Sequence, residues 1–123
     1  MKYTIDKQEH HTLVKLQSEK LDAETGKPFK QELMKNLANA NKFVILNMSS
    51  VFLCTEDGYI MLKEVEKSLR DQNGMLILTE LQENIFQELK DSDFTLIPTD
   101  VEAIDFAFME QLERHFLDPD TEL

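Results

Sequence analysis

Two short runs of apolar residues, FVILNM at 43–48 and MLIL at 75–78, most constrain how this chain can fold. A strand with one solvated face alternates apolar and polar residues, whereas a nearly continuous apolar run is typical of a strand covered on both faces. The segment between the runs has a helical period, with Met61, Val65 and Leu69 on one face. Strand, helix and strand therefore predict a right-handed crossover unit with two parallel, buried strands.

The rest of the sequence adds a β-hairpin, a further strand and three more helices. Period-two alternation predicts strands over Tyr3–Lys7 and Thr12–Leu16, with His10 and His11 at the turn between them. A short strand is predicted over 95–97, and helices over 28–38, 57–69, 81–89 and from Thr99 or Asp100 to Phe116. This order predicts the fold class α/β, with a mixed, mainly parallel β-sheet opened by the hairpin.

The chain of 123 residues has the length of one domain. We expect this domain over 1–117, followed by a flexible C-terminal tail over 118–123. Pro28 is expected in the first turn of its helix, where a missing N–H costs nothing.

The net charge of the chain restricts the classes of partner that it can bind. Its 24 acidic and 13 basic residues give a net charge of −11, which repels nucleic acid and anionic membranes. No apolar run approaches the roughly 18 residues that span a bilayer, so no membrane insertion is expected. The first residues lack the apolar core of a signal peptide. We therefore expect a cytoplasmic protein whose partner is a protein with a basic surface.

Patterns for catalysis, cofactors and metals are missing from the sequence. The three glycines form neither GxGxxG nor GxxxxGK[ST], and no HExxH or CxxC pattern is present. The only cysteine, Cys54, lies in an apolar run and is expected to be a buried, inert thiol. We predict no cofactor, no metal site and no enzymatic activity.

The stretch TEDG at 55–58 lies between a buried strand and the following helix. Threonine and aspartate both cap helices well, so either Thr55 or Asp57 is expected to cap this one.

The sequence around this stretch, VILNMSSVFLCTEDGYIML, resembles the STAS domain that is found in anti-sigma-factor antagonists. The family pattern is an apolar strand, then [DN]-L-S-x-V-x-F, an apolar residue and D-S-S-G. Asn47, Ser49, Val51 and Gly58 fall on this pattern without gaps. SEKLDAETGKPFKQEL is similar to the family's G-x-L-D and its helix, and EAI at 102–104 is similar to the start of its last helix. The resemblance implies about four helices packed mainly on one face of the sheet.

The resemblance also implies a protein switch. In the family, an anti-sigma factor that is also a serine kinase phosphorylates the second serine of D-S-S-G, and the unmodified form binds this kinase. Here Asp57 occupies the position of that serine. Three alternatives follow: Asp57 mimics the phosphorylated state, the domain binds another partner without phosphorylation, or Thr55 is the phosphoacceptor.

The resemblance thus implies a bacterial regulator of transcription that acts by protein–protein binding and partner switching. The alternative is a non-switching STAS scaffold subunit of a signalling or lipid-transport assembly. The sequence does not decide whether the protein forms a homodimer, for which Tyr59 is a candidate contact residue. The predicted partner-binding residues are Val51, Leu53, Thr55, Glu56, Asp57, Gly58, Tyr59 and Met61.

Overall fold

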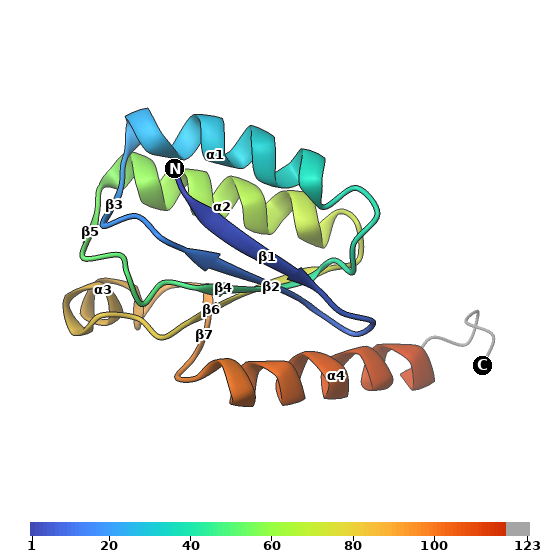
Figure 1. The fold of residues 1–123 in the computed structure, drawn as a ribbon. Helices are drawn as coiled ribbons and strands as arrows, with labels where there is room; N and C mark the ends of the chain where they lie inside the picture. The colour runs from blue at the N-terminus through green and yellow to red at the C-terminus, as the bar shows by residue number, and fades with distance from the viewer. Residues whose placement is uncertain (118–123) are drawn as a thin grey trace.

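The computed structural model describes residues 1–117, which form a β-sheet layer between helices (Figure 1). The predicted tail over 118–123 lies outside these residues. The elements in chain order are β1 (Tyr3–Lys7), β2 (Thr12–Leu16), β3 (Lys20–Leu21), α1 (Ala23–Asn36), β4 (Phe43–Asn47), β5 (Leu53–Cys54), α2 (Glu56–Arg70), β6 (Met75–Thr79), α3 (Glu83–Leu89), β7 (Thr95–Ile97) and α4 (Asp100–Leu117).

The main sheet has five strands in the order β1-β2-β4-β6-β7. Strands β1 and β2 are antiparallel, and each remaining neighbouring pair is parallel. The turn of the hairpin is closed by the backbone N–H of Gln8, which donates to the carbonyl oxygen of His11 at 2.9 Å. This topology confirms the predicted α/β fold with a mixed sheet opened by a hairpin.

Strand β4 serves two cores, which explains its continuous apolar sequence. Val44 and Leu46 face the larger core, to which α1, α2 and α3 contribute, whereas Phe43 and Ile45 face a smaller core beneath α4. All four side chains are buried. Three helices thus pack on one face, as predicted, and α4 is the one helix of residues 1–117 that covers the other (Figure 1).

Helix α1 begins earlier than its hydrophobic period indicates. The carboxylate of Asp22 accepts the backbone N–H of Thr25 at 3.0 Å, and the Thr25 hydroxyl oxygen accepts the N–H of Asp22 at 3.0 Å. This capping box fixes the start of the helix at Ala23. The prediction that Pro28 lies in the first turn is therefore wrong: it lies in the second turn, inside the helix. The helix also ends at Asn36, two residues before the predicted end.

A second, two-stranded sheet was not predicted. Strands β3 and β5 pair in parallel, with Lys20 opposite Leu53 and Leu21 opposite Cys54. Two residues are too few to show a strand period in the sequence. This small sheet holds the connection between β4 and α2 against the start of α1, because the N–H groups of Phe52 and Leu53 both donate to the carbonyl oxygen of Glu19.

A buried polar network connects the sheet to α4. Asn47 at the end of β4 donates through Nδ2 to the Asp100 carboxylate at 2.7 Å, and the Thr79 hydroxyl at the end of β6 donates to its other oxygen at 2.5 Å. Asn47 also accepts the backbone N–H of Ser49 at 2.9 Å. The network therefore joins the first residues of α4 to the loop that follows β4.

Replacing Asp100 by alanine should destabilise the fold, because it leaves the buried groups of Asn47 and Thr79 without an acceptor. We expect the free energy of unfolding to fall by about 1–3 kcal/mol, measured by urea denaturation. Asp105→Ala removes the same charge from an exposed position of the same helix and should change stability by no more than about 0.5 kcal/mol. Equal effects of the two substitutions would contradict a role for the network.

Candidate functional site

The start of α2 is held in place by Thr55. Its hydroxyl oxygen accepts the backbone N–H of Gly58 at 3.3 Å, and its hydroxyl donates to the carbonyl oxygen of Leu21 at 3.5 Å. Its backbone N–H also donates to Leu21, at 3.0 Å. Thr55 is therefore the residue that caps α2, and Asp57 lies in the first turn of the helix.

Gly58 allows α2 to approach β3 closely. A Cβ atom at this position would collide with the carbonyl oxygen of Leu21 and would lie 2.9 Å from Sγ of Cys54. Neither neighbour has room to move, since Leu21 is completely buried and Cys54 nearly so. The glycine of the TEDG stretch is thus required by packing against the second sheet.

The residues predicted to bind a partner divide into buried and exposed groups. Val51, Gly58 and Met61 are buried beneath the surface. These residues cannot contact a partner directly, so the predicted set of contact residues is too large by these three. Leu53, Glu56 and Asp57 are exposed, and Thr55 and Tyr59 are half-buried.

Two further exposed apolar residues lie within the predicted contact segments, 51–55 and 56–61, but the sequence pattern did not single them out. Phe52 is 56% exposed and Ile60 is 50% exposed, the same fraction as Leu53. Ile60 adjoins the buried stripe of α2 and is easily taken for part of it, whereas Phe52 lies in an apolar run that suggests burial. We call the exposed set the loop–helix surface: Phe52, Leu53, Glu56, Asp57 and Ile60.

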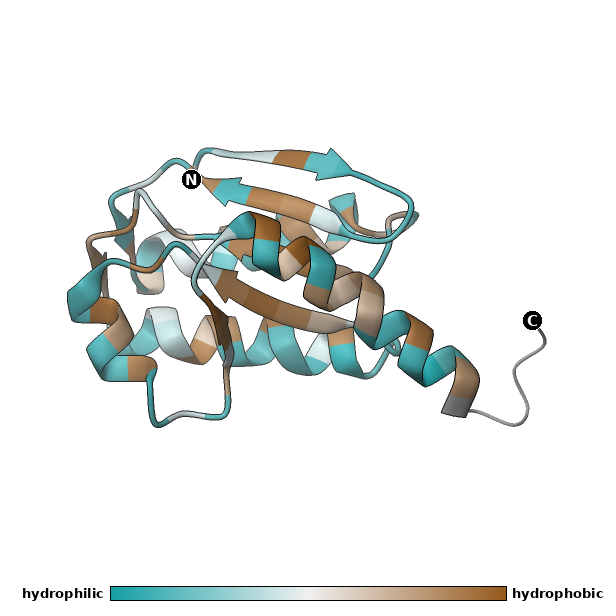
Figure 2. Cartoon of the chain, turned by 90° about the horizontal axis from the view of Figure 1, so that it is seen from below, coloured by the Kyte–Doolittle hydropathy of each residue, from teal (hydrophilic) through white to brown (hydrophobic). Residues whose placement is uncertain are grey.

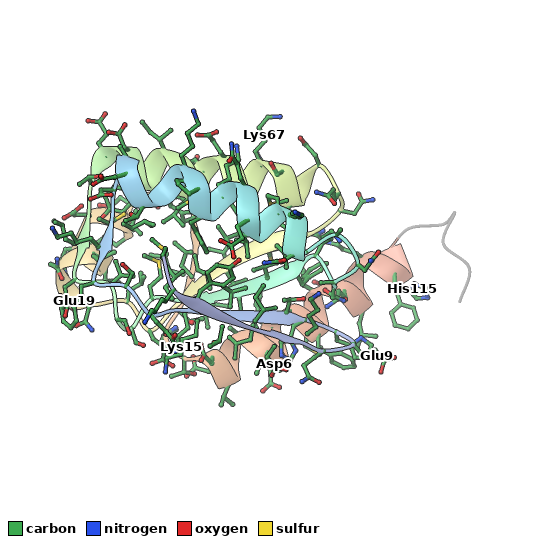
Figure 3. The ribbon with its side chains drawn as sticks, turned by 45° about the horizontal axis from the view of Figure 1, so that its top comes forward. Asp6, Glu9, Lys15, Glu19, Lys67 and His115 are labelled. Carbon is green, nitrogen blue, oxygen red and sulfur yellow. The ribbon has the colours of Figure 1, made fainter. Side chains whose placement is uncertain are left out.

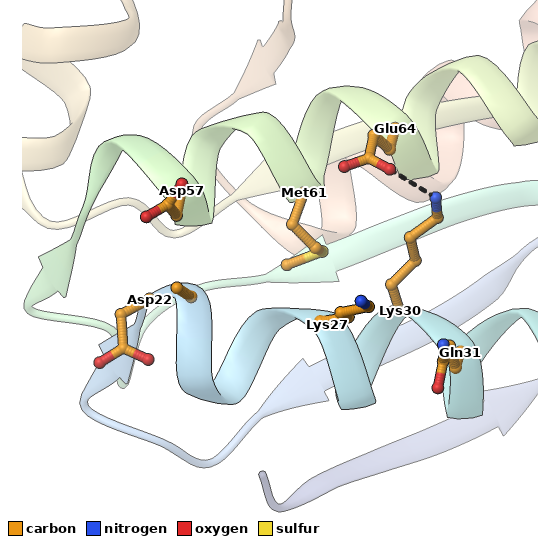
Figure 4. A pocket seen from close by; sticks show the side chains of 8 residues that line it. Asp22, Lys27, Lys30, Gln31, Asp57, Met61 and Glu64 are labelled. Carbon is orange, nitrogen blue, oxygen red and sulfur yellow. Dashed lines mark hydrogen bonds and ion pairs between the residues drawn. The ribbon is translucent and has the colours of Figure 1, made fainter.

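Asp57 also faces a groove between α1 and α2 (Figure 4). The groove has a volume of about 420 Å³ and carries the lysines Lys27 and Lys30 on its α1 side. Lys30 is paired with Glu64 of α2 at 2.7 Å. Within residues 1–117, no side chain forms a hydrogen bond or an ion pair with the carboxylate of Asp57. Its charge is therefore available to a partner.

Tyr59 connects α2 to α3 rather than projecting into solvent. Its hydroxyl donates to the carboxylate of Glu88 at 2.6 Å, and both burial and this carboxylate raise the pKa of the tyrosine. Burial, with a smaller effect of the Glu88 charge, raises the pKa of the Cys54 thiol to about 12. Cys54 is thus a neutral, buried thiol at physiological pH.

Charged side chains project from the outside of the molecule, as Figure 3 shows for Asp6, Glu9, Lys15, Glu19 and Lys67. In the part of the chain that the structure describes, His, Cys, Asp and Glu side chains form no cluster of three or more suited to a metal ion. None of the helices described combines the length and the apolar character needed to cross a bilayer.

Replacing Gly58 by alanine should destabilise the protein, because the added methyl group has no space. We expect a loss of about 1–3 kcal/mol in the free energy of unfolding, measured by urea denaturation. Gly26, which lies inside α1, is the matched control. A Cβ atom at this position would meet the side chain of Met61 at 3.4 Å, an ordinary contact distance. Gly26→Ala should raise stability by about 0.5–1 kcal/mol. A stable Gly58→Ala variant would contradict the close approach of α2 and β3.

The buried thiol predicts a loss of stability at alkaline pH. The unfolded thiol ionises near the ordinary pKa of 9.0, whereas the folded one ionises only near 12. The folded state therefore retains its proton longer, and the contribution of Cys54 is complete below pH 9.0 and is lost as the pH rises toward 12. Unfolding free energies across this range should fall more steeply for the wild type than for Cys54→Ser. Parallel curves would show that the folded thiol titrates normally.

Comparison with known proteins identifies the family. The profile of the STAS domain matches residues 2–105. No curated protein sequence matches the chain. Among solved structures, a serine-to-glutamate variant of RsbS from Moorella thermoacetica has a TM-score of 0.73 and 19% identity, over 93% of this chain and 99% of that one.

Two further structures share the fold. The anti-sigma factor antagonist SpoIIAA of Bacillus, in its phosphorylated form, has a TM-score of 0.67 and 15% identity, over 85% of this chain and 98% of that one. The murine anion transporter Slc26a9 has a TM-score of 0.70 and 15% identity, over 80% of this chain, which spans only 18% of the transporter's length. The family profile covers every strand, helices α1, α2 and α3 and the start of α4, and the chain belongs to the STAS domain family.

Proposed function

We propose that this STAS domain is a regulatory protein that binds a kinase-type anti-sigma factor through the loop–helix surface. The observation that carries the proposal is the exposed, unpaired carboxylate of Asp57 in the first turn of α2, in a segment that also exposes the apolar side chains of Phe52, Leu53 and Ile60. Desolvated apolar contacts supply most of the affinity of protein interfaces, and a charge at their edge controls which partner is accepted. Asp57 is placed to do the second.

Asp57 would act as a permanent form of the signal that relatives receive by phosphorylation. The first turn of α2 exposes backbone N–H groups and the positive end of the helix dipole, which tolerate a negative charge. An aspartate carries about one charge at pH 7, whereas a phosphoserine carries about −1.5 to −2. We propose that Asp57 weakens binding of the kinase-type partner and does so without a phosphorylation cycle.

The contacts of Thr55 favour this role of Asp57 over phosphorylation of Thr55. A phosphate on the Thr55 hydroxyl would remove its donation to Leu21 and its acceptance from Gly58. Loss of a helix cap costs about 1 kcal/mol, and the hydroxyl is half-buried at the junction with β3. Thr55 therefore acts in this proposal as the cap that holds Asp57 in position.

The proposal describes a non-catalytic, cytoplasmic protein. The chemistry of the described residues supports the absence of catalysis, because the thiol of Cys54 is neutral and buried and the hydroxyl of Tyr59 is held by Glu88. Neither group is poised as a nucleophile.

A non-switching scaffold subunit of a signalling or lipid-transport assembly is the second candidate. It is favoured by the same substitution, since a position that holds Asp57 cannot be modified by a serine kinase. Neighbouring genes distinguish the two candidates: a gene for a serine-kinase-type anti-sigma factor favours the regulator, and transporter genes favour the scaffold.

Removing the charge of Asp57 should strengthen binding of the kinase-type partner. We expect Asp57→Ser and Asp57→Ala to bind serine-kinase-type anti-sigma factors of the same cell about tenfold more tightly than the wild type, measured by titration calorimetry. Tenfold corresponds to about 1.4 kcal/mol, a typical effect of one interface charge. Only Asp57→Ser should then accept phosphate, detected by mass spectrometry.

Two controls accompany this experiment. Asp91→Ser removes the same charge from an exposed loop after α3 and should leave the affinity unchanged. Ile60→Ser should weaken binding by both the wild type and the Asp57→Ala variant. Unchanged affinity in Asp57→Ser and Asp57→Ala would remove the regulatory role of Asp57, and phosphate on Thr55 of the wild type would make Thr55 the switch.

A further inference from the structure

The large apolar side chains that are exposed in residues 1–117 gather in two regions. One group, formed by Phe52, Leu53, Ile60 and Phe86, lies around the loop–helix surface and α3. The other lies on α4 and consists of Val101, Phe106, Phe108, Met109 and Phe116. Figure 2 views the sheet from the α4 side and shows apolar and polar bands alternating along this helix.

Helix α4 is apolar on two sides, and its larger side chains are on the outer one. It contacts the sheet through the buried alanines Ala103 and Ala107, with Ile104 partly buried against the same core. Val101, Met109 and Phe116 are spaced by eight and seven residues, or about two turns, and so lie along one side of the helix. They are 72%, 60% and 68% exposed. We call Val101, Met109 and Phe116 the outer face of α4; Phe108, whose ring packs edge to face against His10 at 5.0 Å, lies at its margin toward the β1–β2 turn.

The charged side chains that α4 itself contributes are mainly acidic. Helix α4 carries five acidic residues, and three of them, Glu102, Asp105 and Glu113, are exposed. Its only arginine or lysine is Arg114, which turns back toward the sheet edge. The Arg114 guanidinium lies 4.9 Å from the centre of the Phe43 ring and donates to the carbonyl oxygen of Asn73 at 3.1 Å. Arg114 also pairs with Glu110 at 3.4 Å. Asp105, midway between Val101 and Met109, lies on the outer side itself. Within residues 1–117 the exposed Glu102, Asp105 and Glu113 have no ion-pair partner, so they are left to an external cation.

This charge pattern selects among the occupants that an apolar face could take. A second copy of the chain, with a net charge of −11, would bring carboxylates against carboxylates. An anionic membrane would be repelled in the same way. An amphipathic helix of a partner, with lysine or arginine beside its own apolar stripe, would cover the apolar residues of α4 and pair with the acidic residues near them.

We propose that the outer face of α4 binds an amphipathic, basic helix of a partner protein. The surface lies on the opposite face of the sheet from α2 and is separate from the loop–helix surface (Figure 1). Both surfaces can be occupied at the same time, so the domain can join the regulated partner to a second protein. The inference is independent of the role of Asp57.

The probes are two synthetic peptides of about 18 residues, matched to the length of α4. One has leucines on one helical face flanked by lysines, and the other has glutamates in place of the lysines. Amide shifts of the full chain, measured by NMR, should locate the lysine peptide on α4. Its affinity should fall as salt is added, because exposed charges are screened, and the glutamate peptide should bind at least about tenfold more weakly.

Variants separate this surface from the other exposed apolar region. The double substitution Met109→Ser with Phe116→Ser should weaken the lysine peptide about tenfold or more, since two exposed apolar anchors are lost. Ile60→Ser, a matched change on the loop–helix surface, should leave the affinity within about twofold. All three residues are exposed, and circular dichroism checks that each variant is folded. Val101→Ser replaces the double variant if that one does not fold.

Four results would overturn the proposal. Shifts centred on α2, or equal binding of the two peptides, would show that the acidic border of α4 selects nothing. A dimer seen by sedimentation and abolished by the double substitution would make a second copy the occupant. Association of the protein with phosphatidylglycerol vesicles, lost in the double variant, would make a lipid surface the occupant.

Discussion

Both faces of the central strand pair β4 and β6 are apolar and must be buried, and the rest of the structure depends on this constraint. Val44, Leu46, Leu76 and Leu78 face the larger core, and Phe43, Ile45 and Ile77 face the smaller one. Burial of apolar surface on both sides of a sheet requires a helical layer on each side. Helices α1, α2 and α3 provide one layer, and α4 returns across the sheet to provide the other.

The parallel order of these strands also places the polar chemistry. Carboxyl ends of neighbouring parallel strands meet at one edge of a sheet, and the loops that leave this edge carry binding sites in α/β proteins. Asn47 and Thr79 meet there and share the carboxylate of Asp100, and Asn47 also orders the loop through Ser49. The loop–helix surface follows a few residues later. One buried network thus stabilises both the loop that leads to α2 and the start of α4. The two exposed apolar regions are therefore connected to the same hydrogen-bonded network.

The sequence anticipated the long, periodic elements and the family, but it missed contacts between distant short segments. Strands β4 and β6 and helices α2 and α4 were predicted within about two residues, because each has enough residues to show its period. The pair β3 and β5 has two residues per strand and was missed. The predicted start of helix α1 is too late in the sequence, because the capping box at Asp22, and not Pro28, determines where the helix begins. Val51 and Met61 were assigned to the binding surface, although the core contains them.

By itself, the sequence determined the alternation of strands and helices, the burial of the two central strands, the position of Asp57 at the start of a helix and the excess of negative charge. These properties are local or summed along the chain, so periodicity, capping preference and composition report them directly. Only the tertiary structure decided that the hydroxyl of Thr55 is engaged with Leu21, 34 residues away in sequence. It also decided that Phe52 and Ile60 face solvent, and that α4 covers the sheet with Ala103, Ala107 and Ile104 and leaves Val101, Met109 and Phe116 outside. Which side of a segment is exposed depends on the element packed against it, and that element comes from a distant part of the chain.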